Sequence, residues 1–120
     1  MKRYGLALAC ALLAATPALA VDLGGSYKVK GKNADGSAYK GKAEIVVTSE
    51  NTCRITWTEG SSVQNGICMR NGSAFSAAYV FSDGTVGLVI YELADDGSMK
   101  GLWTVADKKG VGEETLTPAD

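Results

Sequence analysis

The stretch YKVKGK at residues 27–32 and the stretch YKGKAEIVV at residues 39–47 decide the fold of this chain. In both, apolar residues or glycine take nearly every second position, and mostly charged residues take the positions between them. A period of two places these sets on opposite faces of an extended strand. Because Asp35-Gly36 is a turn signal between them, the two stretches together predict a β-hairpin.

The same pattern continues along the chain. Further Asn-Gly or Asp-Gly pairs occur at 65–66, 71–72, 83–84 and 96–97, among short runs rich in Val, Ile, Thr, Tyr and Trp, and no useful helical periodicity is present. The expected strands are 26–32, 38–48, 52–58, 62–70, 73–81, 85–93, 98–106 and 111–117. This predicts an all-β fold, a single antiparallel meander of about eight strands that closes into a small up-and-down barrel. A two-sheet β-sandwich is the alternative.

Pairing around Asp35 gives the first hairpin a definite register. Val29 then lies opposite Gly41, and Lys30 lies opposite Lys40. Facing lysines repel each other, so this basic face is expected either to stay in water, where it also discourages edge pairing, or to bind something acidic. The candidate basic patch comprises Lys28, Lys30, Lys32, Lys40 and Lys42.

The first twenty residues have the three parts of a secretory signal peptide. Lys2 and Arg3 are followed by an uncharged apolar run at 5–15 and by the small-x-small site Ala18-Leu19-Ala20. The run is too short for a membrane span, which needs about twenty residues. We therefore expect residues 1–20 to be a cleaved signal peptide, and residues 21–120 to be a single β domain without a transmembrane segment. The Ala-rich signal looks bacterial, so the expected location is the periplasm or the exterior.

Two cysteines lie outside the signal peptide. Cys53 and Cys68 are predicted to form a disulfide, because an isolated pair in a short exported chain is usually oxidised. They are symmetric about Gly60-Ser61, so a hairpin turning there would place the two sulfurs opposite each other.

The same register carries one conflict. It turns Gln64 toward the interior, on the face of Trp57, and points Ile67 outward. Either a bulge near Gly66 re-aims the strand, or a polar side chain enters the interior. The sequence leaves both alternatives open.

The composition argues against an enzyme. The sequence contains no histidine, which removes Ser-His-Asp and Cys-His catalysis and the usual zinc and copper sites. Asp95-Asp96 and Glu113-Glu114 are neighbours, so on a strand their side chains point to opposite faces, and we interpret them as solvent-exposed charges. No catalytic residue, metal or cofactor is predicted. Without Lys2 and Arg3 the chain is net acidic, which argues against a nucleic-acid binder.

Most aromatic residues are expected in the core. If the barrel contains a cavity, its lining is expected to come from a set of four aromatic residues and one amide. These candidate ligand-lining residues are Tyr27, Tyr39, Trp57, Gln64 and Trp103.

Two resemblances follow from these motifs. Gly25-Ser26-Tyr27 ahead of an up-and-down pattern, with Asp35-Gly36 and Gly41, resembles the opening of the calycin group, the lipocalins and avidins, although that group prefers Trp at the position of Tyr27. The biotin-contacting residues have no match, so the resemblance implies a barrel and no ligand. The patterns GxYxVxGxNxDGS at 25–37, VGLVIY at 86–91 and GxExLTP at 112–118 are similar to those of small secreted proteobacterial β-barrel proteins, which implies no particular activity.

Two functions are consistent with these features. The first is a non-catalytic exported binding module for a small apolar ligand or a partner protein. The second is an envelope structural or interaction protein that uses its outer face for adhesion or inhibition of an envelope or host protein. An unfilled aromatic cavity would favour the first function, and a filled barrel with an exposed apolar or basic patch would favour the second.

Overall fold

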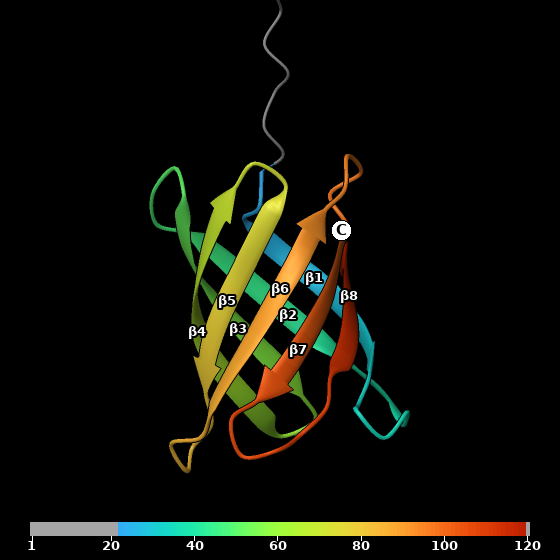
Figure 1. Ribbon diagram of the computed structural model, residues 1–120. Helices are drawn as coiled ribbons and strands as arrows, with labels where there is room; N and C mark the ends of the chain where they lie inside the picture. Colours follow the sequence, from blue (N-terminus) through green and yellow to red (C-terminus); the bar gives the residue numbers. More distant parts are fainter. Residues whose placement is uncertain (1–21, 120) are drawn as a thin grey trace, which may run out of the picture.

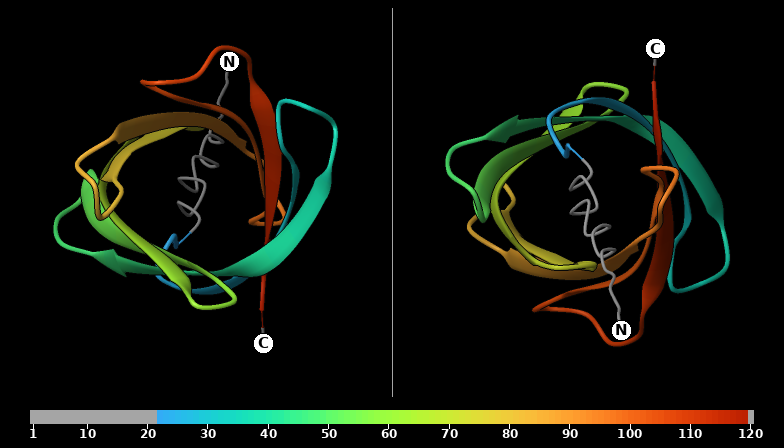
Figure 2. Two further views of the ribbon diagram at one scale, coloured as in Figure 1. Left: turned by 90° about the horizontal axis from the view of Figure 1, so that it is seen from below. Right: turned by 90° about the horizontal axis from the view of Figure 1, so that it is seen from above.

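The computed structural model describes residues 22–119 and shows a single all-β barrel. Eight antiparallel strands follow one another around it in chain order (Figures 1 and 2). They are β1 (Gly25–Lys32), β2 (Ala38–Val47), β3 (Thr52–Glu59), β4 (Ser62–Asn71), β5 (Ala74–Val80), β6 (Val86–Leu93), β7 (Met99–Val105) and β8 (Gly112–Pro118). The predicted strands are confirmed, with bounds that differ by one residue at most.

Strands β1 and β8 pair with each other and close the barrel. Val29 lies opposite Leu116, and Lys32 lies opposite Glu113. Closure removes the free edges that an open sheet or sandwich would expose. The prediction of an up-and-down barrel is therefore confirmed, and the two-sheet sandwich is wrong for this chain.

The register of the first hairpin is the predicted one. Val29 lies opposite Gly41 and Lys30 opposite Lys40, while Tyr27 and Val29 are buried and the lysines between them are exposed. Asp35 shapes the turn, because its Oδ1 accepts hydrogen bonds from the Ser37 backbone N–H at 2.9 Å and from the Ser37 hydroxyl at 2.6 Å.

One end of the barrel is packed solid. This is the end where β1 begins and where β2 turns into β3, shown at the top of Figure 1. Cys53 and Cys68 lie opposite each other with their Cα atoms 4.9 Å apart, and they form the predicted disulfide. The surrounding core comprises Leu23, Ile45, Phe75, Leu93, Met99 and Leu116. These side chains fill the interior of the barrel at this end.

Gln64 resolves the conflict in the third hairpin. The β3–β4 ladder runs without interruption from Thr52 opposite Met69 to Glu59 opposite Ser62, so there is no bulge at Gly66. Gln64 instead lies opposite Trp57 and is half-buried on the inner face. The polar side chain enters the interior because it lies toward the less tightly packed end of the barrel.

The described residues contain no helix of the length and apolarity that a membrane-spanning helix requires.

Candidate functional site

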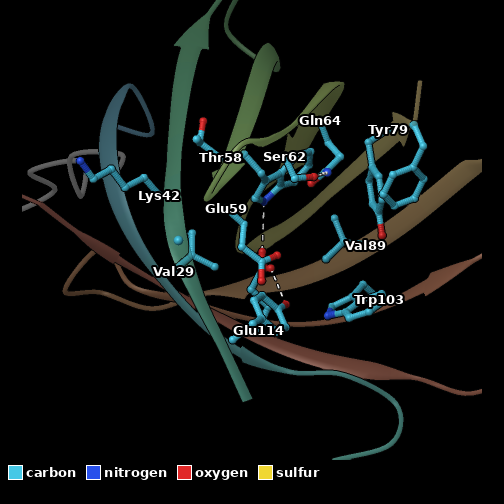
Figure 3. Close-up of a pocket in the computed structure, with 14 residues that line it drawn as sticks. Val29, Lys42, Thr58, Glu59, Ser62, Gln64, Tyr79, Val89, Trp103 and Glu114 are labelled. Carbon is cyan, nitrogen blue, oxygen red and sulfur yellow. Dashed lines mark hydrogen bonds between the residues drawn. The ribbon is translucent and has the colours of Figure 1, made fainter. Parts of the chain in front are cut away.

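A cavity of about 190 Å³ opens at the end of the barrel opposite the disulfide. It lies where β3 turns into β4, and Figure 3 shows the side chains that surround it. Aromatic and aliphatic side chains make up much of its wall, and one buried carboxylate lies among them. The lining residues are Val29, Tyr39, Gly41, Lys42, Trp57, Thr58, Glu59, Ser62, Gln64, Tyr79, Phe81, Val89, Trp103 and Glu114.

Glu114 is the polar centre of the cavity. Its side chain is 8% exposed, and three donors from three different strands converge on its carboxylate. The Tyr39 hydroxyl donates to Oε1 at 2.7 Å, the Trp57 indole N–H donates to Oε2 at 3.1 Å, and the Tyr91 hydroxyl also donates to Oε2. These bonds fix the carboxylate, because a buried acceptor without partners would be costly.

Strand alternation places Glu114 inside. Gly112, Glu114 and Leu116 are the buried positions of β8, whereas Glu113 is exposed. The expectation that Glu113-Glu114 is a pair of solvent-exposed charges is therefore wrong for Glu114. Leu116 fixes the inner face of the strand, and a period of two carries that face back to Glu114.

The tyrosines around Glu114 are held in their neutral form. Burial, followed by the nearby Glu114 charge, raises the pKa of Tyr91 and the pKa of Tyr39 well above the usual value, and raises the pKa of Tyr79 to about 12. Each phenol therefore keeps its proton at neutral pH. The three donors to Glu114 are therefore neutral groups, and none of them brings a positive charge to the carboxylate.

Aromatic rings enclose the space beside Glu114. The Trp57 and Tyr79 ring centroids are 5.1 Å apart, and those of Tyr79 and Phe81 are 5.7 Å apart, both in edge-to-face geometry. Tyr39 and Trp103 make a similar contact at 6.2 Å. The buried Trp103 Nε1–H has no hydrogen-bond partner within the protein, which is unusual for a buried donor.

Glycines on neighbouring strands make room for these rings. Tyr39 lies directly opposite Gly31, Tyr79 opposite Gly87, and Trp103 opposite Gly112. A Cβ atom at any of these glycines would overlap the facing ring. Each of these rings therefore lies against the inner wall of the barrel, over a glycine of the neighbouring strand.

The structure brings four of the five predicted lining residues together. Tyr39, Trp57, Gln64 and Trp103 line the cavity. Tyr27 does not, because it lies near the packed end, where its hydroxyl donates to the Leu23 carbonyl at 2.7 Å. Its ring occupies core space that the cavity does not reach, so its assignment to the lining is wrong.

Sequence reasoning missed part of the site. Glu114 was set aside as one of two adjacent charges, although the alternation of β8 could have placed it inside. Tyr79 and Phe81 are absent from the predicted lining, because most aromatic residues are expected in the core. They reach the cavity because β5 ends at its mouth.

A wider depression of about 640 Å³ lies outside the cavity at the same end. It is formed by the 33–35, 82–85 and 107–110 turns and by the ends of β5 and β7, and it shares Phe81 and Trp103 with the inner cavity. Ligand pockets in proteins are typically about 300–1,000 Å³, so the inner cavity accommodates only a small group. A larger ligand would extend past Phe81 and Trp103 into the depression.

The predicted basic patch lies outside the barrel. The five lysines are exposed, and two pairs face each other directly, Lys28 opposite Lys42 and Lys30 opposite Lys40. Lys42 also contributes to the rim of the cavity, together with Glu59. Among residues 22–119, no group of three or more His, Cys, Asp or Glu side chains could hold a metal ion.

Comparison with known proteins supports the fold. No protein family and no curated protein sequence matches this chain. Solved structures that resemble it are small β-barrels of low sequence identity. A redesigned β-barrel has a TM-score of 0.69 at 17% identity, covering 82% of this chain and 92% of that one.

Two further barrels show the same likeness. A de novo designed fluorescence-activating β-barrel has a TM-score of 0.65 at 14% identity, covering 80% of this chain and 93% of its own. A redesigned barrel solved with the ligand DFHBI has a TM-score of 0.68 at 17% identity, covering 79% and 94%. At these identities the likeness establishes the eight-strand barrel and nothing about a ligand of this chain.

Proposed function

We propose that this protein is a non-catalytic binding module that takes a small, largely apolar ligand into the barrel. The observation that carries this proposal is the cavity beside Glu114, where aromatic side chains lie around a buried carboxylate held by hydrogen bonds. A concave apolar site with a few well-placed polar groups is the usual form of a small-molecule site. Packing is asymmetric along the barrel, because core side chains fill the interior at the disulfide end and leave a cavity at the other end.

The structural neighbours support this function at the level of architecture. One of the similar designed barrels was solved with a small molecule, DFHBI. An eight-strand barrel of this size therefore has enough interior to hold a small ligand when its lining leaves room. The nature of the ligand depends on the side chains that line the cavity of this chain.

The polar groups of the cavity are arranged for recognition. The chain has no histidine, and Glu114 is held by three hydrogen bonds. Gln64 donates its amide to the Ser62 hydroxyl at 2.7 Å. These contacts position the side chains and pair none of them as a nucleophile with its base, so we assign the cavity a binding role without catalysis.

Blocking the cavity tests the proposal. N-phenyl-1-naphthylamine, a neutral apolar fluorophore, is titrated into the wild type and into Gln64→Trp, which places an indole inside the cavity. Val63→Trp is the matched control, because Val63 is the preceding residue and is 53% exposed on the outer face. We expect Gln64→Trp to lose at least about tenfold in affinity, or about 1.4 kcal/mol, and Val63→Trp to bind normally. Equal binding by all three proteins would refute an internal site.

Export is part of the same proposal. The disulfide between Cys53 and Cys68 is compatible with an oxidising compartment, and the predicted signal peptide lies outside the described residues. N-terminal sequencing of the protein from cell fractions should find Val21 first in the periplasm or medium. Cytoplasmic protein that retains residues 1–20 would contradict export.

The lysine patch favours a second candidate function, which is attachment to an acidic envelope or host partner through the outer face. Directly facing lysines such as Lys30 and Lys40 disfavour the hairpin electrostatically, and an acidic partner would relieve that repulsion. The double variant Lys30→Glu/Lys40→Glu should elute earlier than wild type from a heparin column, and its binding to isolated envelopes should fall. Unchanged envelope binding would remove this candidate.

A further inference from the structure

We propose that the ligand of this cavity is a small organic cation without N–H donors, such as a quaternary ammonium group, held between Glu114 and the aromatic walls. The inference deepens the proposed function and rests on it. It combines three features of the cavity: the charge at Glu114, the number of donors that this carboxylate already accepts, and the rings beside it.

The charge of Glu114 has no neutralising partner among its hydrogen bonds. Tyr39, Trp57 and Tyr91 are neutral donors, and the raised pKa values of the two tyrosines show that their protons stay in place. A buried carboxylate interacts strongly with a nearby charge, because the surrounding dielectric is low. A cation in the cavity would therefore be attracted to Glu114, and an anion would be repelled.

The donors already present restrict the kind of cation. A carboxylate offers about four lone-pair sites, and three donors already approach Glu114. A primary ammonium or guanidinium group brings several N–H donors, which Glu114 could not all accept. A quaternary ammonium group has no donors to satisfy, so it can use the charge of Glu114 without leaving an unpaired polar group.

The aromatic rings of the cavity provide a second attraction for a cation, through cation–π contacts. Trp57, Tyr79, Phe81 and Trp103 all line the cavity, and Trp is the strongest aromatic partner for a cation. Aromatic cages around quaternary ammonium groups are an established use of this interaction. The methyl groups of such a cation are apolar and can pack against the aromatic rings of the cavity. The charge of Glu114 and the apolar walls therefore favour the same class of ligand.

The size and rim of the cavity fit a compact head group. The inner space is about 190 Å³, which limits its occupant to a small group, while any longer substituent would extend toward Phe81, Trp103 and the outer depression. The rim carries Glu59 and Lys42, which are both exposed. These opposite charges are solvated and screened, so the buried carboxylate dominates the preference inside the cavity.

Three probes of nearly equal shape isolate the charge preference. Choline is the cation, 3,3-dimethylbutanol is its neutral isostere, and 3,3-dimethylbutyrate is the anionic analogue. The two tryptophans of the chain, Trp57 and Trp103, both line the cavity, so their indole N–H signals in ¹H–¹⁵N NMR titrations report occupancy directly. We expect choline to bind the wild type at least about tenfold more tightly than the alcohol, and the butyrate not to bind.

Two variants that each remove one negative charge show which carboxylate causes the preference for a cation. Glu114→Gln can keep its contacts, since the amide oxygen can replace Oε2 for Trp57 and Tyr91 while the Tyr39 hydroxyl turns to accept from the amide NH₂. We expect this variant to lose about tenfold in choline affinity with unchanged affinity for the alcohol. The control is Glu113→Gln, because Glu113 is the preceding residue on the exposed face of the same strand and does not line the cavity; its choline affinity should stay within about twofold. Dispersed NMR spectra show whether each variant is folded.

The outcomes separate this inference from the proposed function. Equal affinity of the wild type for choline and the alcohol would overturn the cation preference and leave the binding module intact, and this comparison needs no variant. Tighter binding of the butyrate would also overturn it. Equal choline affinity in Glu114→Gln and Glu113→Gln would refute the role of Glu114. Failure of all three probes, together with failure of N-phenyl-1-naphthylamine, would refute the binding module itself.

Discussion

The indole of Trp103 lies across Gly112, its direct neighbour on the adjoining strand. A Cβ atom at position 112 would overlap Cε2, Cζ2 and Nε1 of the ring, so the indole can lie against the barrel wall only because this residue is glycine. The contact holds Trp103 between the inner cavity and the outer depression, both of which it lines. The shape of the cavity mouth therefore depends on residue 112 being a glycine.

Gly112→Ala is predicted to displace Trp103 and destabilise the barrel. The added methyl group overpacks the contact, and insertions of this kind typically cost about 1–3 kcal/mol. Urea unfolding followed by circular dichroism measures the loss, and the Trp103 indole N–H signal should move. Gly24→Ala is the control, because a Cβ there would meet only ordinary contacts from 3.4 Å, and its effect should stay within about 0.5 kcal/mol. Equal losses in the two variants would contradict the contact.

The fold follows from local patterns in the sequence. Alternation in β1 and β2 and the Asp35-Gly36 turn fix the first hairpin, and the two cysteines fix the register of β3 against β4. Each hairpin is specified by residues close in the chain, so turn chemistry and a period of two are sufficient. The pairing of β1 with β8 was predicted only because a meander of eight strands tends to close.

The site was less predictable, because it depends on contacts between distant residues. Trp57 and Glu114 belong to β3 and β8, and only closure of the barrel brings them within hydrogen-bonding distance. Likewise, alternation places Tyr27 and Tyr39 on the same inner face, but it carries no information on depth along the barrel axis. Tyr27 therefore enters the packed end and Tyr39 the cavity.

Glu114→Leu is predicted to destabilise the barrel by about 2–4 kcal/mol, because it leaves the donors of Trp57 and Tyr91 without their acceptor, and each unsatisfied buried donor costs about 1–3 kcal/mol. Tyr39 keeps a longer hydrogen bond of 3.4 Å to the Glu113 carbonyl. Removal of a buried charge offsets part of the loss. Glu113→Leu is the matched control on the exposed face of the same strand. Urea unfolding should show almost no change for the control. A Glu114→Leu variant as stable as Glu113→Leu would show that the three bonds contribute little.

The disulfide is predicted to be a major source of stability. Cys53 and Cys68 are 15 residues apart, and closing a loop of about this length contributes about 3 kcal/mol in the chain-entropy model. The double variant Cys53→Ala/Cys68→Ala should lose about that amount in urea unfolding, and wild type treated with reductant should behave similarly. Reductant should not affect the double variant. Intact mass of the untreated wild type should be two hydrogens below the fully reduced value, and two free thiols would contradict the disulfide.

Stability is predicted to fall in alkaline solution as pH rises from about 10 to about 12. Burial raises the pKa of Tyr79 to about 12, and raises the pKa of Tyr39 and of Tyr91 as well. Above about pH 10, the ordinary pKa of tyrosine, the unfolded chain releases these protons while the folded chain keeps them. The folded state then binds more protons, so the free energy of unfolding decreases with pH. Below pH 10 the contribution is fully present.

The size of this decrease identifies the tyrosines responsible. Each can contribute at most about 1.4 kcal/mol per pH unit, so Tyr91→Phe, which removes the most deeply buried of the three hydroxyls, should make the decrease shallower. Urea unfolding at several pH values measures the slope, and ultraviolet absorbance of tyrosinate measures ionisation in the folded protein. Folded protein should form tyrosinate only at higher pH than urea-unfolded protein. Identical titration curves for the two states would show that the barrel does not protect these hydroxyls, and that the neutral donors around Glu114 are not held as the structure shows.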